Sequence, residues 1–326
     1  MIPTEMVQHL STSVFTPVFD QSNAQAIADE IKHNSGYCVF ENAIAPEALT
    51  AIVDKIRLNG YLINNNIIGV VRSASGNFLS HTLAVSKPCY DIVTSEKVRA
   101  ICQSYFDRPY KVVNQRLYET HTKAHLPWHT DNNLQSGNSF GGKHRLPGIV
   151  FLFYLTDVSD TNPFQLIPDS HKWADESAER YFSDEYIERN YADEIVSVRA
   201  PKGTLIACNS HLVHRAEPFN CPGFSRYTFI FQVDEISEDY VGHGEPLLIN
   251  PSFVNDTNPD ILNYLGFGTE SNYLTLPHTS VATLSPRDLL RMQKTIVPKA
   301  FRGLMASMAK NVLPGSLLNI IRNRVY

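Results

Sequence analysis

Hydrophobic and polar residues follow two different periods along this chain. Apolar side chains recur at helical spacing over residues 22–33, a short strand is predicted at 37–41, and Pro46 opens a second helix. From Tyr110 onward the pattern is that of strands, rich in β-branched and aromatic residues and separated by Gly, Pro, Asn and Asp. Strands are predicted at residues 110–118, 127–131, 148–156, 164–167, 194–199, 203–208, 211–215 and 226–234.

The spacing of these strands indicates the fold class. Short strands with irregular connections fit two packed antiparallel sheets better than alternating strands and helices. We therefore expect a mainly β protein, a double-stranded β-helix (jelly roll) with helices at its N-terminus and a helical tail at its C-terminus. The polar stretch 169–193 interrupts the strands and is interpreted as a helical insertion. One domain is placed at residues 1–284 and the tail at 285–326.

The C-terminal tail has a composition of its own. Ser285, Pro286 and Asp288 are typical of a helix start, and an apolar stripe follows along one helical face. Beyond Asp288 the chain has no acidic residue but seven basic ones. Such a helix can lie on an anionic membrane surface, pack on the β domain or form a dimer contact, and the sequence leaves all three open. The stripe consists of Phe301, Leu304, Met305, Met308 and Val312.

Composition narrows the class of protein. The chain has 326 residues, 43% of them hydrophobic and 19% charged, which is typical of a globular protein rather than a disordered one. A net charge of −5 without a basic run in the body argues against nucleic acid as a partner. We find no secretory signal and no apolar stretch long enough to span a membrane. Five dispersed cysteines without a CxxC pair indicate free thiols, so a cytoplasmic protein is expected.

One group of residues has the chemistry of a metal site. His129 and Asp131 form an H-x-D triplet, and positions i and i+2 of a strand point to the same side. His214, from a distant predicted strand, can supply a third ligand. Two imidazoles and one carboxylate on one face of an ion are typical of non-haem iron(II) sites that activate oxygen. Arg226, at the head of an apolar strand, needs an anionic partner because an unpaired buried charge is costly.

Several alternatives remain open at the level of sequence. An H-x-D triplet also arises by chance, in which case His129 is an ordinary core or surface imidazole. His211 competes with His214 as the third ligand, although strand alternation points it to the other side. The His-Gly-Glu triplet at 243–245 is a second pattern of this kind, in a loop rich in Gly and Pro. Arg226 has a simple alternative, which is a salt bridge to an acidic side chain.

Three segments resemble one protein family. Residues 148–173 are similar to the family's hydrophobic strand, its Leu-Thr-Asp-Val and its Ser-His-Lys. Residues 201–229 are similar to its segment with spaced Gly, His, Asn and Arg, and residues 36–57 resemble its N-terminal strand and helix. Over residues 20–235 the chain thus resembles the phytanoyl-CoA dioxygenase-like (PhyH) family of iron(II)- and 2-oxoglutarate-dependent oxygenases. The resemblance implies a double-stranded β-helix.

The resemblance also implies roles for the residues of the candidate site. His129, Asp131 and His214 would hold iron(II), and Arg226 would pair with the distal carboxylate of 2-oxoglutarate. A side chain from the strand before the H-x-D triplet usually helps to hold this cosubstrate, and the register leaves three candidates. Ala216 departs from the family, because many relatives have a hydroxyl residue at that position. The three candidates for the cosubstrate are Asn114, Gln115 and Arg116.

The activity implied by the resemblance is hydroxylation. Iron(II), 2-oxoglutarate and oxygen would together hydroxylate an aliphatic C–H bond of a small molecule, with ascorbate as a stimulant. Desaturation, epimerisation and cyclisation are alternative outcomes of the same chemistry, whereas a silent binding protein and a cupin-type isomerase or hydrolase belong to other classes. Substrate contacts are expected from Trp128, Lys143 and Arg145, and a small anionic or lipid-linked metabolite would fit the basic residues.

Overall fold

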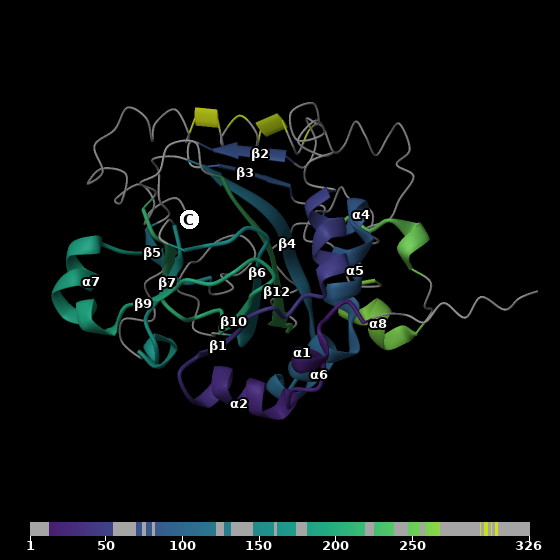
Figure 1. Ribbon diagram of the computed structural model, residues 1–326, viewed down its shortest axis with the longest axis horizontal. Helices are drawn as coiled ribbons and strands as arrows, with labels where there is room; N and C mark the ends of the chain where they lie inside the picture. The colour runs from purple at the N-terminus through teal and green to yellow at the C-terminus, as the bar shows by residue number, and fades with distance from the viewer. Residues whose placement is uncertain are drawn as a thin grey trace, which may run out of the picture.

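Two antiparallel sheets form the centre of the molecule (Figure 1). The computed structural model describes residues 13–54, 70–73, 76–79, 82–121, 127–131, 146–159, 162–173, 181–218, 225–237, 247–254 and 258–267, with 294, 297, 298, 301, 304 and 305. The major sheet has the strand order β1-β10-β6-β12-β4-β3-β2, and the minor sheet has the order β8-β5-β11-β7-β9. This pair of sheets confirms the predicted mainly β, jelly-roll class.

The major sheet contains the long strands and the minor sheet the short ones. The major sheet is built from β1 (Tyr37–Phe40), β2 (Val70–Ser73), β3 (Gly76–Leu79), β4 (Tyr110–His121), β6 (Gly148–Tyr154), β10 (Leu205–Asn209) and β12 (Ser225–Glu235). The minor sheet is built from β5 (Trp128–His129), β7 (Phe164–Leu166), β8 (Tyr181–Phe182), β9 (Val196–Val198) and β11 (His214–Ala216).

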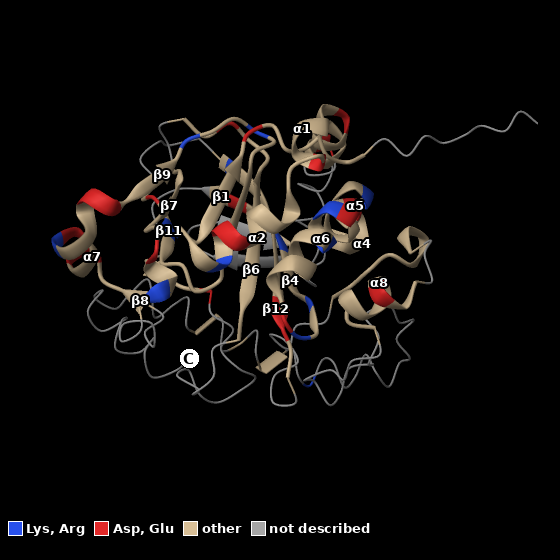
Figure 2. Ribbon diagram, turned by 90° about the horizontal axis from the view of Figure 1, so that it is seen from below, with Lys and Arg blue, Asp and Glu red and all other residues tan. Residues whose placement is uncertain are grey.

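Most of the helices cover the outer face of the major sheet. They are α1 (Pro17–Asp20), α2 (Ala24–His33), α4 (Thr82–Val85), α5 (Lys87–Thr94), α6 (Glu96–Tyr105) and α8 (Pro259–Tyr264), together with a helical stretch at 46–54. A separate helix, α7 (Asp184–Tyr191), lies beyond the minor sheet, at the opposite end of the molecule from α4, α5 and α8 (Figures 1 and 2). Short 3-10 turns lie at Ser170–Lys172, Ala192–Glu194 and Pro251–Phe253.

Strand alternation divides the core into layers. In β12, Phe229, Phe231 and Val233 belong to the large cluster that the helices cover, whereas Gln232 and Asp234 alternate with them and face the minor sheet. All seven residues of β6 are buried, because both of its faces are covered. Phe151 on β6 stacks on Phe231 with ring centroids 4.8 Å apart. The polar residues of β12 are thereby turned toward the space between the sheets.

Side-chain caps and one glycine explain where the helices begin and end. The side chain of Asn23 accepts a hydrogen bond from the backbone N–H of Ala26, which begins α2 at the predicted place. Ser183 caps α7 in the same way. Gly36 adopts a left-handed φ of 87° between α2 and β1, and a side chain there would collide with the ring of His171.

The structure differs from the sequence prediction in three places. All eight predicted strands are present, but the β2–β3 hairpin and the helices α4 to α6 were not predicted. The polar stretch 169–193 contains the expected helix, α7, and also the short strand β8. In the tail only six residues are described, so the predicted boundary at 284/285 and the residues Met308 and Val312 lie outside the described residues. No helix in the described part of the chain is long and apolar enough to cross a membrane.

Candidate metal centre

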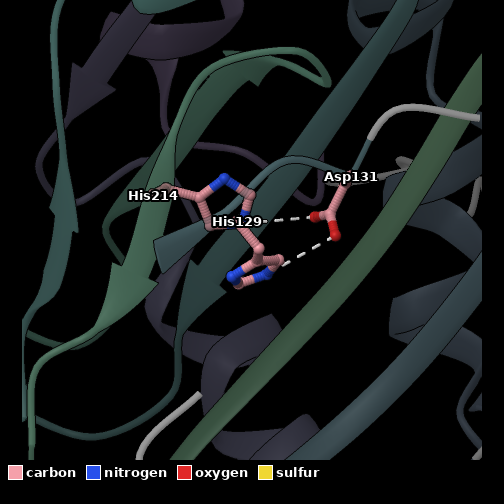
Figure 3. A group of neighbouring side chains, drawn as sticks. All are labelled: His129, Asp131 and His214. Atoms are coloured by element: carbon pink, nitrogen blue, oxygen red, sulfur yellow. Dashed lines mark ion pairs between the residues drawn. The ribbon is translucent and has the colours of Figure 1, made fainter. Parts of the chain in front are cut away.

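Two short strands of the minor sheet bring the candidate ligands together. β5 and β11 pair antiparallel with His129 opposite His214, so both imidazoles project from the same face. Asp131 lies two residues after the end of β5 and turns its carboxylate toward both rings (Figure 3). His129 Nε2 lies 3.7 Å from Asp131 Oδ1, and His214 Nε2 lies 3.3 Å from Asp131 Oδ2. One ligand atom from each residue falls within 4.8 Å of the others.

Backbone carbonyls fix the orientation of both rings. Nδ1 of His129 lies 2.7 Å from the carbonyl oxygen of Pro127, and Nδ1 of His214 lies 2.9 Å from that of Leu212. A carbonyl oxygen only accepts, so each Nδ1 must carry the proton and donate. Each Nε2 is then left with a lone pair for a cation, which is the arrangement found in metal-binding histidines.

The two histidines of the site are shielded from solvent, whereas the carboxylate is partly exposed. His129 and His214 are each 5% exposed, whereas 31% of the Asp131 side chain is exposed. Burial disfavours a charged His214, but the Asp131 carboxylate and the backbone carbonyl of Leu212 together outweigh burial and raise the pKa of this imidazole. The same negative field favours a metal cation. Two imidazole nitrogens and one carboxylate, clustered in this way, fit iron(II) with one coordination face left for other ligands.

A glutamine of the major sheet holds the backbone at Asp131. Nε2 of Gln232 donates to the carbonyl oxygen of Asp131 at 3.1 Å and to Oδ1 of Asp234 at 2.8 Å. Gln232 is 3% exposed and Asp234 is fully buried. The two sheets are therefore linked by a buried polar contact directly behind the carboxylate ligand. This contact could not be predicted from the sequence, because a glutamine inside a strand has many structural uses.

Arg226 is buried next to the site. It is 5% exposed, and burial lowers the pKa of its guanidinium. In the part of the chain that the structure describes, no carboxylate lies within ion-pair distance of it. Its Nη1 donates to the carbonyl of Asn162, and its guanidinium carbon lies 5.9 Å from the ring centroid of Tyr154. Tyr154 Oη in turn accepts from the backbone N–H of Phe164, whose ring stacks on His214 at 5.0 Å.

The structure separates the three residues of β4 that were candidates for cosubstrate binding. Gln115 Oε1 accepts from the backbone N–H of Thr82 in α4, so its side chain faces the helices and not the site. Gln115 is therefore removed from the candidates. Asn114 lies opposite Gln232, on the face that reaches Asp131, and Arg116 lies two residues further along the same face. Asn114 and Arg116 remain candidates.

The other predicted site residues have different positions. Trp128 is fully buried and packs under the guanidinium of Arg215, so we assign it a packing role instead of the expected contact with substrate. Lys143, Arg145 and the triplet at 243–245 lie outside the described residues. His211 is not part of the cluster, because its Nε2 lies 3.0 Å from the carbonyl oxygen of Leu146.

One residue beside the site was missed at the level of sequence. Tyr181 of β8 pairs with His129, and their ring centroids are 6.3 Å apart. Directly paired residues of neighbouring strands share a face, so Tyr181 lies on the side of the ligands. A strand of two residues leaves no recognisable alternation, which explains why the polar stretch around it indicated only a helix.

Comparison with known proteins agrees with this geometry. The model of the phytanoyl-CoA dioxygenase (PhyH) family matches residues 33–226, which is more than half of the chain. The chain belongs to the phytanoyl-CoA dioxygenase family. It is therefore a 2-oxoglutarate-dependent non-haem iron dioxygenase, with iron and 2-oxoglutarate as its cofactors. No curated protein matches the sequence of this PhyH-family member.

Solved structures resemble this PhyH-family protein in fold. The carbocyclase SnoK from nogalamycin biosynthesis has a TM-score of 0.50 at 15% identity, with 67% of this chain and 85% of that chain covered. The epimerase SnoN from nogalamycin biosynthesis has a TM-score of 0.48 at 13% identity, with 65% and 82% covered. HygX from Streptomyces hygroscopicus, crystallised with nickel, 2-oxoglutarate and hygromycin B, has a TM-score of 0.49 at 13% identity, with 66% and 87% covered. Of these three, SnoK reaches a TM-score of 0.5, and at 15% identity its likeness shows the fold alone.

Proposed function

We propose that this dioxygenase hydroxylates an aliphatic C–H bond of a small molecule at a centre formed by His129, Asp131 and His214. The observation that carries the proposal is the pre-oriented cluster of two imidazoles and one carboxylate beside a buried arginine that has no acidic partner among the residues that the structure describes. A catalytically silent protein has no need for a buried unpaired charge, which is costly to maintain. A cupin-type isomerase or hydrolase does not bind 2-oxoglutarate and would therefore have no use for the buried charge of Arg226.

Each residue has a role that follows from its contacts. When bound, iron would let dioxygen react with 2-oxoglutarate, so that one oxygen atom enters succinate, carbon dioxide is released and the second oxygen atom is available to hydroxylate the substrate C–H bond. His129 and His214 present Nε2 because their Nδ1 atoms donate to backbone carbonyls. Asp131 supplies the negative charge that balances the cation. Arg226 is suited to pair with the distal carboxylate of 2-oxoglutarate, because a guanidinium matches a carboxylate with two parallel hydrogen bonds.

The outcome at the substrate carbon is a separate question. SnoN is described as an epimerase and SnoK as a carbocyclase, and both are described as α-ketoglutarate dependent. Desaturation, epimerisation and cyclisation would use the same three ligands and the same arginine. We favour hydroxylation as the default outcome, and analysis of the product distinguishes it from the others. The small-molecule substrate itself is expected to be anionic, because Lys143 and Arg145 follow the H-x-D triplet, or lipid-linked, because the tail is basic.

The experiment that tests this function is uncoupled turnover. Anaerobically purified protein is mixed with iron(II), 2-oxoglutarate and ascorbate, oxygen is admitted, and succinate is followed with and without pools of small molecules. The wild type is expected to form succinate and Asp131→Ala is expected to form none. Absence of succinate from the wild type, together with no iron(II)–2-oxoglutarate absorption band, would contradict the proposal and favour a silent binding protein.

For the tail we propose peripheral contact with an anionic membrane surface. Val297, Phe301, Leu304 and Met305 are each more than half exposed, at the spacing of one helical face. The seven basic residues without an acid complement negatively charged lipids. Flotation with vesicles containing phosphatidylserine tests this proposal. The wild type is expected to float with the vesicles, and the double variant Phe301→Ser/Leu304→Ser is expected to remain unbound in the bottom fraction. If the wild type does not bind the vesicles at physiological salt, membrane binding is excluded. A molecular mass in solution that rises with protein concentration would instead indicate that the tail forms a dimer contact.

A further inference from the structure

The outer face of the minor sheet contains a buried arginine with an unusual set of contacts. Arg215, next to His214, is 8% exposed, and its guanidinium carbon lies 4.4 Å from the ring centroid of Trp128, next to His129. His129 and His214 are opposite each other in an antiparallel pair, so Arg215 and Trp128 fall opposite each other one step along the strands. The ligands occupy one face of this pair of strands, and the stacked arginine and tryptophan occupy the other.

Arg215 also forms charged and polar hydrogen bonds on both sides of this stack. Its Nε donates to Oε1 of Gln165 on β7 at 2.8 Å, and its Nη1 donates to Oδ1 of Asp184 on α7 at 2.6 Å. Gln165 continues the row by donating to Oγ of Ser197 on β9 at 3.0 Å. One side chain therefore connects α7, β5 and β7 to the strand that presents His214, and Gln165 extends the connection to β9.

Short strands need such contacts to hold their register. β5 has two residues and β11 has three, and the two strands share the single register pair of His129 and His214. A ladder of this length fixes neither the spacing nor the rotation of the two imidazoles by itself, because register is set by many consecutive pairs and by side-chain packing. The backbone carbonyls orient each ring in its own strand, but they do not fix one strand relative to the other.

We propose that Arg215 is a positioning residue for the metal centre, acting as a bracket with Trp128, Gln165 and Asp184 that sets the separation of His129 and His214. The inference rests on the proposed function, since it assigns a task to residues behind the ligands. The planar guanidinium suits this task because it stacks on the indole and uses its edge for Gln165 and Asp184 at the same time. A lysine in its place would keep a charge near Asp184 but lose the stack and the geometry of the fork.

The bracket reaches helix α7 at the end of the molecule through Asp184 (Figure 2). Asp184 is the first residue of α7, and Ser183 caps the helix by accepting from the backbone N–H of Tyr186. The carboxylate of Asp184 is thereby held at the start of the helix, and its side chain is 36% exposed. The polar stretch that interrupts the strands is thus connected to the ligand strand through the bracket.

Cobalt(II) binding to the full-length apoprotein tests the bracket without reference to activity. Cobalt(II) is titrated and its visible absorption bands are recorded, because their energies and intensities report on ligand geometry. Arg215→Met is expected to weaken cobalt(II) affinity by about 10-fold or more, which is typical for partners behind metal ligands, and to change the band shape. Arg215→Lys is expected to be intermediate. Arg189→Met removes an exposed arginine from the same helix α7 and is expected to bind as the wild type does.

The outcomes separate this inference from the proposed function. A folded Arg215→Met protein with wild-type affinity and an unchanged cobalt(II) spectrum would overturn the bracket and leave the proposed function intact. Failure of the wild type to bind cobalt(II) would overturn the metal centre and the bracket together. If Arg215→Met does not fold, Asp184→Asn carries the test, because this side chain is partly exposed. A several-fold loss of affinity supports the bracket, and wild-type affinity in Asp184→Asn then overturns it.

Discussion

His211 and His214 lie three residues apart but have different surroundings. The ring of His211 has its Nε2 next to the carbonyl of Leu146, whereas the ring of His214 has its Nδ1 next to the carbonyl of Leu212. A backbone carbonyl at Nδ1 leaves Nε2 available for a metal, and a carbonyl at Nε2 occupies it. Sequence alternation favoured His214, but only the ring contacts, which depend on the folded backbone, separate the two residues.

We predict that His214→Ala abolishes cobalt(II) binding and that His211→Ala does not. Loss of the hydrogen bond to Leu146 is expected to lower the free energy of unfolding by about 1 kcal/mol, with the metal affinity unchanged within a few-fold. Cobalt(II) titration and urea unfolding of both variants provide the two measurements. A His211→Ala protein that folds but loses the metal would reverse the assignment of the third ligand.

A second prediction at this scale concerns Arg226. Its guanidinium is buried without an acidic partner among the described residues, so it is available for the distal carboxylate of 2-oxoglutarate. Arg226→Met is expected to weaken 2-oxoglutarate binding by about 100-fold, and Arg226→Lys by less, because a lysine keeps the charge but not the bidentate geometry. Titration of the iron(II)–2-oxoglutarate absorption band measures this. Wild-type affinity in Arg226→Met would exclude the assignment.

The secondary-structure elements show what the sequence could predict. The strands from Tyr110 onward were found because each has apolar residues at a clear period and ends in turn residues. β8 was missed because two residues carry too little pattern, and the β2–β3 hairpin was missed because Val70–Ser73 and Gly76–Leu79 do not alternate between apolar and polar residues. The register of Asn114, Gln115 and Arg116 stayed open because a bulge between Gln232 and Val233 shifts the pairing of β12 with β4.

Two buried glutamines in neighbouring strands offer a matched pair of variants. Gln232→Leu removes the donor to the carbonyl of Asp131 and to buried Asp234, so we expect a loss of about 1–3 kcal/mol in the free energy of unfolding and a several-fold loss of metal affinity. Gln115→Leu, on the helix face, is expected to lower stability without changing metal affinity. Equal metal affinity in both variants would show that Gln232 acts on stability alone.

At the scale of the whole molecule, the fold and the three metal ligands were predicted, whereas the residues that surround the ligands were not. The jelly roll follows from strand number and spacing, and His129, Asp131 and His214 follow from a triplet plus one distant histidine. Contacts that cross between layers, such as Gln232 to Asp131, leave no pattern along the chain. The predicted roles of Lys143 and Arg145 stay predictions, because these residues lie outside the described part.

Global stability is expected to depend on pH through Lys111. Its side chain is 9% exposed, and burial lowers its pKa from 10.5 to about 8. Between these values the unfolded chain binds more protons than the folded one, so the free energy of unfolding rises with pH from about 8 to 10.5. Lys111→Met is expected to be more stable than the wild type at pH 7.5, with a difference that shrinks toward pH 10.5.

Urea unfolding at several pH values measures this dependence. Lys202→Met, at an exposed position, serves as the control and is expected to follow the wild type at every pH. A stability difference between Lys111→Met and the wild type that stays constant from pH 7.5 to 10.5 would contradict the lowered pKa.

The single register pair between β5 and β11 has a consequence for the life of the protein in a cell. A bound metal would cross-link His129, Asp131 and His214, and a ligand that binds only the folded state stabilises it by mass action. We expect the metal-free protein to open more often at this pair of strands and to be degraded faster by proteases. Iron supply would then set the abundance of the enzyme as well as its turnover, so that cells short of iron would hold fewer copies of it.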